Sequence, residues 1–408
     1  MKLGIVLLRN HDLRLTDQPA LYYASLYCNI VLPLYIYSNP QSEVESLGSN
    51  QRARASEVFT MEAIKSLRND LRKKGSTLIM RKIETYNAED VVDSMMHLLR
   101  DLNFGGDVNM FMNTRYEPKA RSIDKYIVEY LQMKGIEVHT YNANLLYDPQ
   151  DVSLTMTGNK WTGHWGTLMP FVNTCRKIGS PLKPLGNPGN LNLPEEFKKS
   201  IENLNEEPLV DANFKIWADK IKESWIITEE KAEISMYKFL QEGGLANYET
   251  ERSRVDKEDS VSRLSPYLRH GLLSPRTLYW AIEEAAYTKE QKKTFGRRLF
   301  WRDLAYFQLS TFPEMASKSI RTHYDFQQWA EPEQLYVYAW QRGQTGYPMV
   351  DAAMRELYAT GWMHQSMRMV VASFLVEFMG IDWRYGFQWF HDTLVDADVA
   401  INSMMWQK

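Results

Sequence analysis

The segment LGIVLL at residues 3–8 opens a series of strand-like segments that determines the class of fold. A second run, IVLPLYIY, occupies residues 30–37. Short apolar runs without alternation are typical of strands that are buried on both faces of a parallel sheet. Residues 77–80, 108–112 and 137–141 are the next strand candidates.

Segments with the helical spacing of apolar residues separate these strands. Residues 51–74 end in KKG, residues 88–102 follow, and residues 118–134 have Pro near their start and Gly after their end. Alternation of strands and helices with short connections predicts an N-terminal α/β domain with a doubly wound parallel sheet over residues 1–145.

The pattern changes after this region. Residues 146–207 contain a cluster of Pro and Gly between positions 181 and 194, which predicts an irregular interdomain connector. Residues 208–408 show no strand alternation, so we expect an all-α C-terminal domain. Its predicted helices are residues 229–242, 265–268, 275–286, 294–310, 348–360 and 363–378.

Composition excludes several classes of protein. The 408 residues carry a net charge of −3, with 44% hydrophobic and 24% charged residues, which is unlike collagen, disordered chains or a polycation. Cys28 and Cys175 are the only cysteines, so we expect no disulfide framework and a cytoplasmic or nuclear, reducing location. No apolar run is long enough to span a bilayer, and the start is too short for a signal peptide.

The usual catalytic motifs are missing. The first strand is followed by RNHDLRLTD at residues 9–17, not by the glycine pattern of a dinucleotide-binding turn. There is no Walker-type loop, no Gly-x-Ser-x-Gly elbow and no metal-ligand spacing, so we expect no metal. The α/β half alone reads as a scaffold without a recognisable ligand site.

Two motifs of the helical half have a functional and a structural interpretation. SRLS at residues 262–265 precedes a helix and can hold a phosphate there, or Ser262 or Ser265 can simply cap that helix. In GWMHQSMRM at residues 361–369, His364 and Arg368 are four apart on one face. Arg368 needs a carboxylate if it is buried, and the motif DAD at 396–398 offers one, either for structure or for function.

Tryptophan is concentrated in the same half. Of 12 tryptophans, eight lie between Trp280 and Trp406. By default they anchor the core. Indole is also easily oxidised by one electron, so closely spaced rings can relay a hole away from an oxidising cofactor.

Six motifs share one resemblance. They are DLRLTDQPAL at residues 12–21, WRD at 301–303, WQRGQTGYPMVDAAMR at 340–355, GWMHQSMRM at 361–369, DWR at 382–384 and DAD at 396–398. Together they closely resemble the photolyase/cryptochrome family, from the first strand to the last residue. The resemblance implies an α/β antenna domain (residues 1–145), a connector (146–207) and an all-α FAD-binding domain (208–408).

The resemblance also implies the cofactor and its contacts. FAD is held in a folded conformation. The residues carried over as its contacts are Tyr248, Ser262, Ser265, Trp301, Arg302, Arg368, Asp396, Asp398 and Asn402. In this scheme Arg368 and Asp396 form an ion pair beside the flavin ring, and Asn402 faces its N5 atom.

By the same resemblance, the chemistry is light-driven electron transfer. Trp406, Trp383 and Trp329 are the proximal, middle and surface members of an electron relay, and reduced FAD splits a bound pyrimidine dimer. Asn402 counts with the relay as a catalytic residue, because its neutral amide favours the photolyase type of redox behaviour over that of plant cryptochromes, which have Asp there.

The expected lesion pocket departs from the family. Its residues are Arg298, Trp301, Gln365 and Met369. Arg298 replaces a Glu that accepts hydrogen bonds from the lesion bases, and an Arg only donates. Gln365 replaces Asn or His, and Lys408 replaces an aromatic residue. The family also continues for several tens of residues beyond this point, so the resemblance implies a shortened C-terminal end and a less covered FAD cavity.

The antenna and the DNA surface are less defined. Lys119 and Ala120 replace the Asn and Glu of folate-binding members, so a second antenna chromophore is of unknown identity: a deazaflavin, a second flavin or an empty site. Candidate phosphate contacts are Arg252, Arg254, Lys257, Arg263, Arg269, Lys292, Lys293, Arg297 and Arg298. Such a groove gives salt-dependent binding, whereas the alternative is a solvated face with compensating acids.

Two main functions follow from these observations. The first is a DNA photolyase, a carbon–carbon lyase whose partner is DNA with ultraviolet lesions; Asn402, Trp301 and Met369 favour it. The second is a cryptochrome-like photoreceptor with a signalling protein as partner, which Arg298, Gln365 and Lys408 favour. A third alternative is a truncated member that has lost FAD. In each case we expect a monomer that does not contact membranes.

Overall fold

A five-stranded parallel sheet forms the centre of the N-terminal part. The computed structural model describes residues 1–156, 166–208 and 215–408. The strands are β1 (Lys2–Leu8), β2 (Ile30–Tyr37), β3 (Ile79–Lys82), β4 (Asp107–Asn113) and β5 (Glu137–Tyr141), in the order β3-β2-β1-β4-β5. All four pairings are parallel. The predicted doubly wound α/β fold is confirmed.

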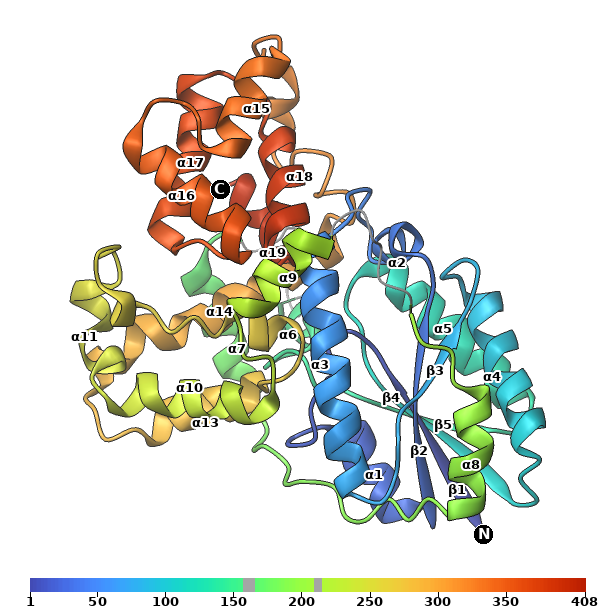
Figure 1. The fold of residues 1–408 in the computed structure, drawn as a ribbon. Coiled ribbons are helices and arrows are strands. Elements are labelled where there is room, and N and C mark those ends of the chain that lie inside the picture. Colours follow the sequence, from blue (N-terminus) through green and yellow to red (C-terminus); the bar gives the residue numbers. More distant parts are fainter. Residues whose placement is uncertain (157–165, 209–214) are drawn as a thin grey trace.

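Helices cover both faces of the sheet (Figure 1). On one side lie α1 (Pro19–Tyr27) and α3 (Arg54–Lys73), and on the other α4 (Ala88–Leu102) and α5 (Pro118–Met133). The alternation of β1 divides its side chains between two cores: Val6 and Leu8 pack with Phe59 of α3, whereas Ile5 and Leu7 pack with Val91 and Ile127. The short α2 (Pro40–Ser46) follows β2.

The segment expected to be irregular contains helices. They are α6 (Pro149–Met156), α7 (Leu168–Ile178) and α8 (Glu195–Leu204). The expectation was wrong for these stretches because each is short and amphipathic, which the Pro- and Gly-rich run between them obscured. That run, residues 181–194, indeed has no regular secondary structure. Residues 157–165 lie outside the described residues.

The C-terminal part is helical, and its described residues contain no strand. Its α-helices are α9 (Lys215–Glu223), α10 (Glu229–Gln241), α11 (Gly244–Glu251), α12 (Ser265–Arg269), α13 (Pro275–Glu284), α14 (Lys289–Thr311), α15 (Gln334–Arg342), α16 (Pro348–Thr360), α17 (Gln365–Ser373), α18 (Trp383–Thr393) and α19 (Val399–Trp406). α17 continues into a π-helical turn, Phe374–Phe378. No helix in the described ranges has the length and apolarity that crossing a membrane requires.

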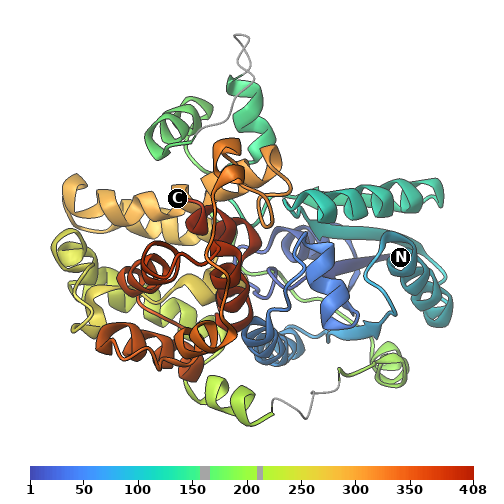
Figure 2. The same cartoon turned by 90° about the horizontal axis from the view of Figure 1, so that it is seen from above.

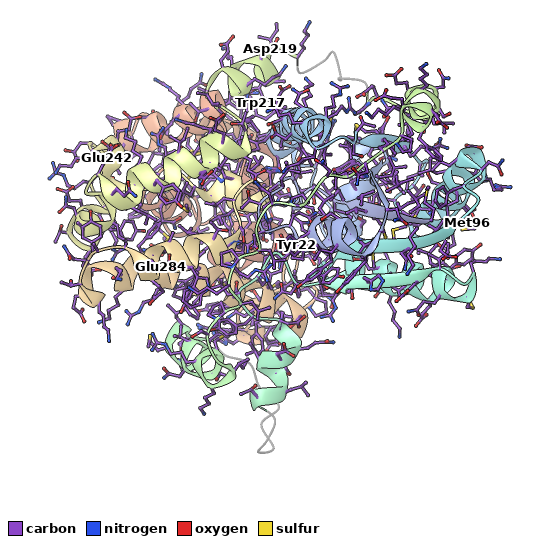
Figure 3. All side chains as sticks on the ribbon, turned by 90° about the horizontal axis from the view of Figure 1, so that it is seen from below. Tyr22, Met96, Trp217, Asp219, Glu242 and Glu284 are labelled. Carbon is purple, nitrogen blue, oxygen red and sulfur yellow. The ribbon has the colours of Figure 1, made fainter. Side chains whose placement is uncertain are left out.

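The two parts lie side by side (Figure 2). Figure 3 labels Met96 on the outer side of the α/β part, Glu242 and Glu284 on the outer side of the helical part, and Tyr22 of α1 near the middle. One hydrophobic cluster runs through both, from Val6 in the sheet to Met404 in α19. The two parts therefore share a core.

The motif at residues 12–21 fixes this joint. The fully buried Arg14 donates hydrogen bonds to the carbonyls of Ala143 and Gly271, both at 3.1 Å. Asp17 pairs with Arg276 of α13 at 2.9 Å. Gly271 has φ +73°, and a Cβ there would lie 1.9 Å from the carbonyl oxygen of His11, so only glycine fits.

A neutral histidine completes the joint. His270 stacks on Phe59 with ring centroids 4.6 Å apart, and its Nε2 lies 2.9 Å from the Val395 carbonyl. Its Nδ1 lies 3.1 Å from the Thr60 hydroxyl. These partners assign the proton to Nε2. Burial, with a smaller effect of Arg269, lowers the pKa of His270 from 6.5 to about 3.

This histidine makes the joint sensitive to acid. Since its folded pKa lies below its unfolded value, the unfolded chain binds one more proton between pH 6.5 and about 3. The free energy of unfolding then falls as the pH falls, by up to about 1.4 kcal/mol per pH unit from this residue. We expect His270→Asn to remove that part of the slope in urea unfolding measured from pH 7 to pH 4.

The exposed His323 provides the matched control, and His323→Asn should leave the slope unchanged. Equal slopes for His270→Asn and the unchanged chain would contradict the assignment.

Candidate functional site

A cavity of about 280 Å³ lies within the helical part. Side chains from α11, α12, α14, α17 and α19, with the segments before α12 and α19, form its wall. Eight of the nine residues expected to bind the cofactor line it: Tyr248, Ser262, Ser265, Trp301, Arg302, Arg368, Asp396 and Asp398. The structure thus brings together residues that are up to 150 positions apart in the sequence.

An ion pair fixes one side of this cavity. Arg368 meets Asp396 through two parallel hydrogen bonds of 3.1 and 2.9 Å. The Arg368 Nε donates to the Met363 carbonyl at 2.8 Å, and the Ser265 hydroxyl donates to Asp396 at 2.6 Å. Asp396 is almost fully buried and Arg368 is 19% exposed. Both charges are therefore satisfied, as burial requires.

The starts of α12 and α17 differ from what the sequence predicted. α12 begins at Ser265, its cap residue is Leu264, and no side chain caps it, so neither Ser262 nor Ser265 is an N-cap. The Ser265 hydroxyl is instead engaged by Asp396. His364 does not share a helix face with Arg368: it caps α17, and its Nδ1 accepts from the Ser366 amide at 3.1 Å. An imidazole can cap a helix, although the preferred caps are Ser, Thr, Asp and Asn.

Asp398 is a buried residue of the cavity wall. Its Oδ1 caps α19 by accepting from the Ile401 amide, and its Oδ2 accepts from the Tyr306 hydroxyl at 2.5 Å. Burial and the neighbouring Asp398 raise the pKa of Tyr306 well above its usual value, so Tyr306 keeps its proton and donates. Arg269 donates to the Ala397 carbonyl at 2.6 Å and lies 4.0 Å from Asp398.

Asn402 is buried one turn into α19 but is not among the residues that line the cavity. Its side-chain amide donates to the Phe387 carbonyl of α18 at 3.1 Å. This bond ties α19 to α18.

The tryptophans expected to form a relay differ in burial. Trp406 ends α19 and is partly buried, Trp383 is buried at the start of α18, and Trp329 is partly buried. Trp406 lies directly against α18, because a Cβ on Gly386 would be 2.0 Å from its Cη2 atom. Gly386 follows Trp383 by about one helical turn. Trp406 therefore contacts α18 about one turn away from Trp383.

The expected lesion pocket is only partly assembled. Arg298, Trp301 and Gln365 line the same cavity, together with Lys408. Met369 does not line it, and its side chain is 52% exposed on α17. The expected contribution of Met369 to this pocket therefore has no support in the geometry.

The cavity wall is strongly positive. Two carboxylates, Asp396 and Asp398, face six cations: Arg263, Arg269, Arg298, Arg302, Arg368 and Lys408. A surplus of donors and positive charge in a partly buried site suits an anionic ligand with many acceptor oxygens.

A larger cavity of about 660 Å³ lies between the sheet and the helical part. Its wall includes Tyr35, Tyr37, Glu43, Glu57 and Thr60 from the α/β side. Burial raises the pKa of Glu43 to about 8, so this carboxyl is largely protonated at neutral pH. His391 and Val399 approach from the helical side, and Arg269 lines both cavities.

Comparison with known proteins identifies this arrangement. Residues 5–188 match DNA photolyase, and residues 295–408 match the FAD-binding domain of DNA photolyase. The chain is 33% identical to a deoxyribodipyrimidine photo-lyase of Agrobacterium fabrum, over 97% of this chain and 78% of that protein. It is 29% identical to Cryptochrome-1 of Arabidopsis thaliana, over 97% of this chain but only 56% of that protein.

Solved structures agree. A bacterial class III photolyase from Agrobacterium tumefaciens superimposes with a TM-score of 0.83 at 31% identity, covering 99% of this chain and 78% of that one. An archaeal photolyase from Sulfolobus tokodaii, described with two FAD molecules, gives a TM-score of 0.73 at 27% identity, covering 100% of this chain and 82% of that one. The chain belongs to the photolyase/cryptochrome family, and its helical part contains the FAD-binding domain of that family.

The residues present fit FAD. The positive wall suits its diphosphate, and the Arg368–Asp396 pair presents a fixed polar edge to a ring. The predicted cofactor and the predicted family are therefore confirmed, whereas the role of each residue stays a proposal.

The expected basic surface is largely neutralised within the chain. Arg254 pairs with Asp256, Lys257 with Glu251, and Lys293 with Glu290. Lys292 donates to the carbonyls at the end of α13, and Arg269 is held inside. Among the nine candidates in the described ranges, Arg252 and Arg297 have neither an ion pair nor a hydrogen bond of this kind.

The sequence analysis did not predict three features of the site. They are the hydrogen bond of Tyr306 to Asp398, the position of Arg269 in the walls of both cavities, and the contact of Trp406 with Gly386. Tyr306 follows Arg302 by one helical turn, so its place on the cavity side of α14 was readable from spacing. Gly386 stands inside a tryptophan-rich helix, where an isolated glycine signals close approach of another group. Arg269 was expected to be a phosphate contact, and its position in the walls of both cavities had no signal in the sequence, because the two cavities are formed by separate parts of the chain.

The ion pair at the cavity is directly testable. Asp396→Asn leaves the Arg368 guanidinium with one weak acceptor in place of a carboxylate, so we expect lower retention of FAD and a loss of up to about 3 kcal/mol in unfolding free energy. Flavin absorption per protein and urea unfolding measure the two effects.

Asp382→Asn is the matched control, because it breaks a more exposed pair with Arg384 while keeping an Asn at the N-cap of α18. Equal loss of flavin in both variants would mean that the cavity does not depend on the Arg368–Asp396 pair.

Proposed function

We propose that this chain is a DNA photolyase that repairs ultraviolet pyrimidine dimers by light-driven electron transfer. The observation that carries the proposal is Asn402, a neutral amide that holds α19 against α18 beside the cofactor cavity. The photolyases among its relatives, at up to 33% identity, support the same reading.

FAD, when bound, supplies light-driven one-electron chemistry. The chain's own residues hold and orient the cofactor: Arg368 and Asp396 present fixed donors and acceptors, and Asp398 with Tyr306 forms a satisfied polar end of the cavity. The positive cavity wall would attract the diphosphate. Asn402 is a neutral amide beside the cavity, and the absence of a negative charge on that side chain would favour the reduced state that repair requires.

Trp406, Trp383 and Trp329 carry electrons inward from the surface. Support comes from the contact of Trp406 with Gly386, one turn from Trp383, and from the partial solvent access of Trp329. Solvent next to the outer indole would stabilise the charge that arrives there.

The alternative is a photoreceptor of the cryptochrome type with a signalling protein as partner. Arg298 and Lys408 favour it, because two cations stand where a lesion-binding carboxylate and an aromatic ring would be expected. Relatives include plant cryptochromes, of which the chain spans only about half to two thirds in two cases. The open cavity and its complete ion pair do not favour a member that has lost FAD.

We further propose that the larger cavity holds the second chromophore. Lys119 and Ala120 lie at the start of α5, and neither lines it. The protonated carboxyl of Glu43 and the tyrosines of β2 suit a flat, uncharged heterocycle with acceptor atoms better than a polyanion.

Repair itself is the decisive measurement. We expect reduced, FAD-loaded protein under blue light to restore DNA that carries cyclobutane dimers, whereas the same mixture in darkness leaves it unchanged. A second substrate with (6-4) products separates the two lesion types. If both lesions persist while flavin photoreduction proceeds, the photoreceptor alternative replaces the enzyme.

The relay gives a separate prediction. Trp406→Phe should slow flavin photoreduction by at least about tenfold, equivalent to about 1.4 kcal/mol in the barrier, because phenylalanine is much harder to oxidise. Absorption during illumination follows the reaction.

Trp389→Phe is the matched control, since Trp389 shares α18 with Trp383 but stacks on Tyr358, with ring centroids 6.0 Å apart. Normal photoreduction in Trp406→Phe, or equal slowing in Trp389→Phe, would remove the relay assignment.

A further inference from the structure

Two cations lie on the same wall of the smaller cavity, and one of them covers an indole. The Lys408 ammonium lies 3.5 Å from the centroid of the Trp301 ring. Arg298 lies on the same helix as Trp301, and its Nε donates to the Tyr248 hydroxyl at 3.1 Å. All four side chains line the cavity. A cation over an indole face occupies the place where a flat ring would stack.

The remaining cations of this wall have partners inside the chain. Arg368 pairs with Asp396, and Arg269 donates to the Ala397 carbonyl. Arg302 donates to the Asn144 carbonyl. Arg263 stacks on Trp362 at 4.5 Å and faces Glu258 at 3.9 Å.

Arg298 and Lys408 differ from these. Among the described residues, neither lies within ion-pair distance of a carboxylate. Each contacts an uncharged aromatic side chain: a phenol for Arg298 and an indole for Lys408. They therefore supply positive charge that the protein itself does not compensate.

The two cations also act on each other. The pKa of Lys408 is lowered mainly by burial and, to a smaller extent, by the charge of Arg298. An oxygen anion placed between them would relieve this repulsion and gain charge-assisted hydrogen bonds. A ligand that offers only N–H groups would leave every donor here unpaired, because Arg and Lys do not accept.

We propose that Arg298, Lys408 and Trp301 form a subsite that recognises a nucleotide by its phosphate oxygens. The base stacks on Trp301 where the Lys408 ammonium now lies, and the displaced ammonium turns with Arg298 toward the phosphate. This inference rests on the proposed function, since it names how nucleic acid is read at that site: by charge and stacking, not by hydrogen bonds accepted from the base.

Two sources can supply this phosphate: a free nucleotide and a DNA strand. Calorimetric titration of the FAD-loaded protein in darkness separates them. The probes are thymidine 5′-monophosphate, thymidine, inorganic phosphate and a short single-stranded thymidine oligonucleotide. We expect the monophosphate to bind at least about tenfold more tightly than thymidine, equivalent to about 1.4 kcal/mol. Tighter binding of the oligonucleotide assigns the phosphate to DNA.

Charge reversal then locates the subsite. Arg298→Glu should abolish the preference for the monophosphate over thymidine, and Lys408→Ala should reduce it severalfold. The matched control is Lys289→Glu, which reverses an exposed positive charge at the start of the same helix, outside the cavity wall. We expect this control to keep the preference.

Flavin content and thermal unfolding of each variant show whether it folds. If Arg298→Glu loses flavin, the preference for the monophosphate over thymidine is measured instead in Arg298→Gln and Lys408→Ala. Equal binding of thymidine and its monophosphate, or equal loss of the preference in Lys289→Glu, overturns the proposal. Because binding is measured without light, a protein that binds the monophosphate but repairs nothing refutes the photolyase function and leaves the subsite intact.

Discussion

The buried ion pair of Arg368 and Asp396 is the constraint on which the helical part depends. A guanidinium that enters a largely apolar helix needs a carboxylate, since removing either partner leaves an unpaired charge in a medium that cannot solvate it. Asp396 meets this need from the segment before α19, and Ser265 adds a third contact from α12. The pair thus holds three separate segments at fixed positions around one cavity.

The charge of the cavity follows from the same principle. Cations that the fold needs are paired with carbonyls or carboxylates, whereas Arg298 and Lys408 meet only aromatic partners. A wall of this kind binds anions, which agrees with FAD as the cofactor of the family. The shared core of the two parts and Arg269, which lines both cavities, place the larger cavity next to this site.

The pattern of apolar residues along the chain predicted those strands and helices well whose stability comes mainly from burying one apolar face or run. The apolar runs of β1 and β2 became central parallel strands, and the predicted helix at 348–360 has the same bounds as α16. The segment 146–207 was misjudged, because Pro and Gly between 181 and 194 concealed short helices that depend on packing for their stability. His364 was misplaced for a similar reason: helical spacing continues across a boundary that only the cap geometry reveals.

The sequence by itself determined the order of strands and helices and the family, because periodicity and long motifs are local properties of the chain. Only the tertiary structure decided which of the expected cofactor residues share a wall, and it brings eight of the nine to one cavity. It placed Met369 outside the cavity, turned the Asn402 amide to Phe387, and set Lys408 over Trp301. These positions result from packing between segments that are distant in sequence, and the burial that sets their charges and pKa values exists only once those segments meet.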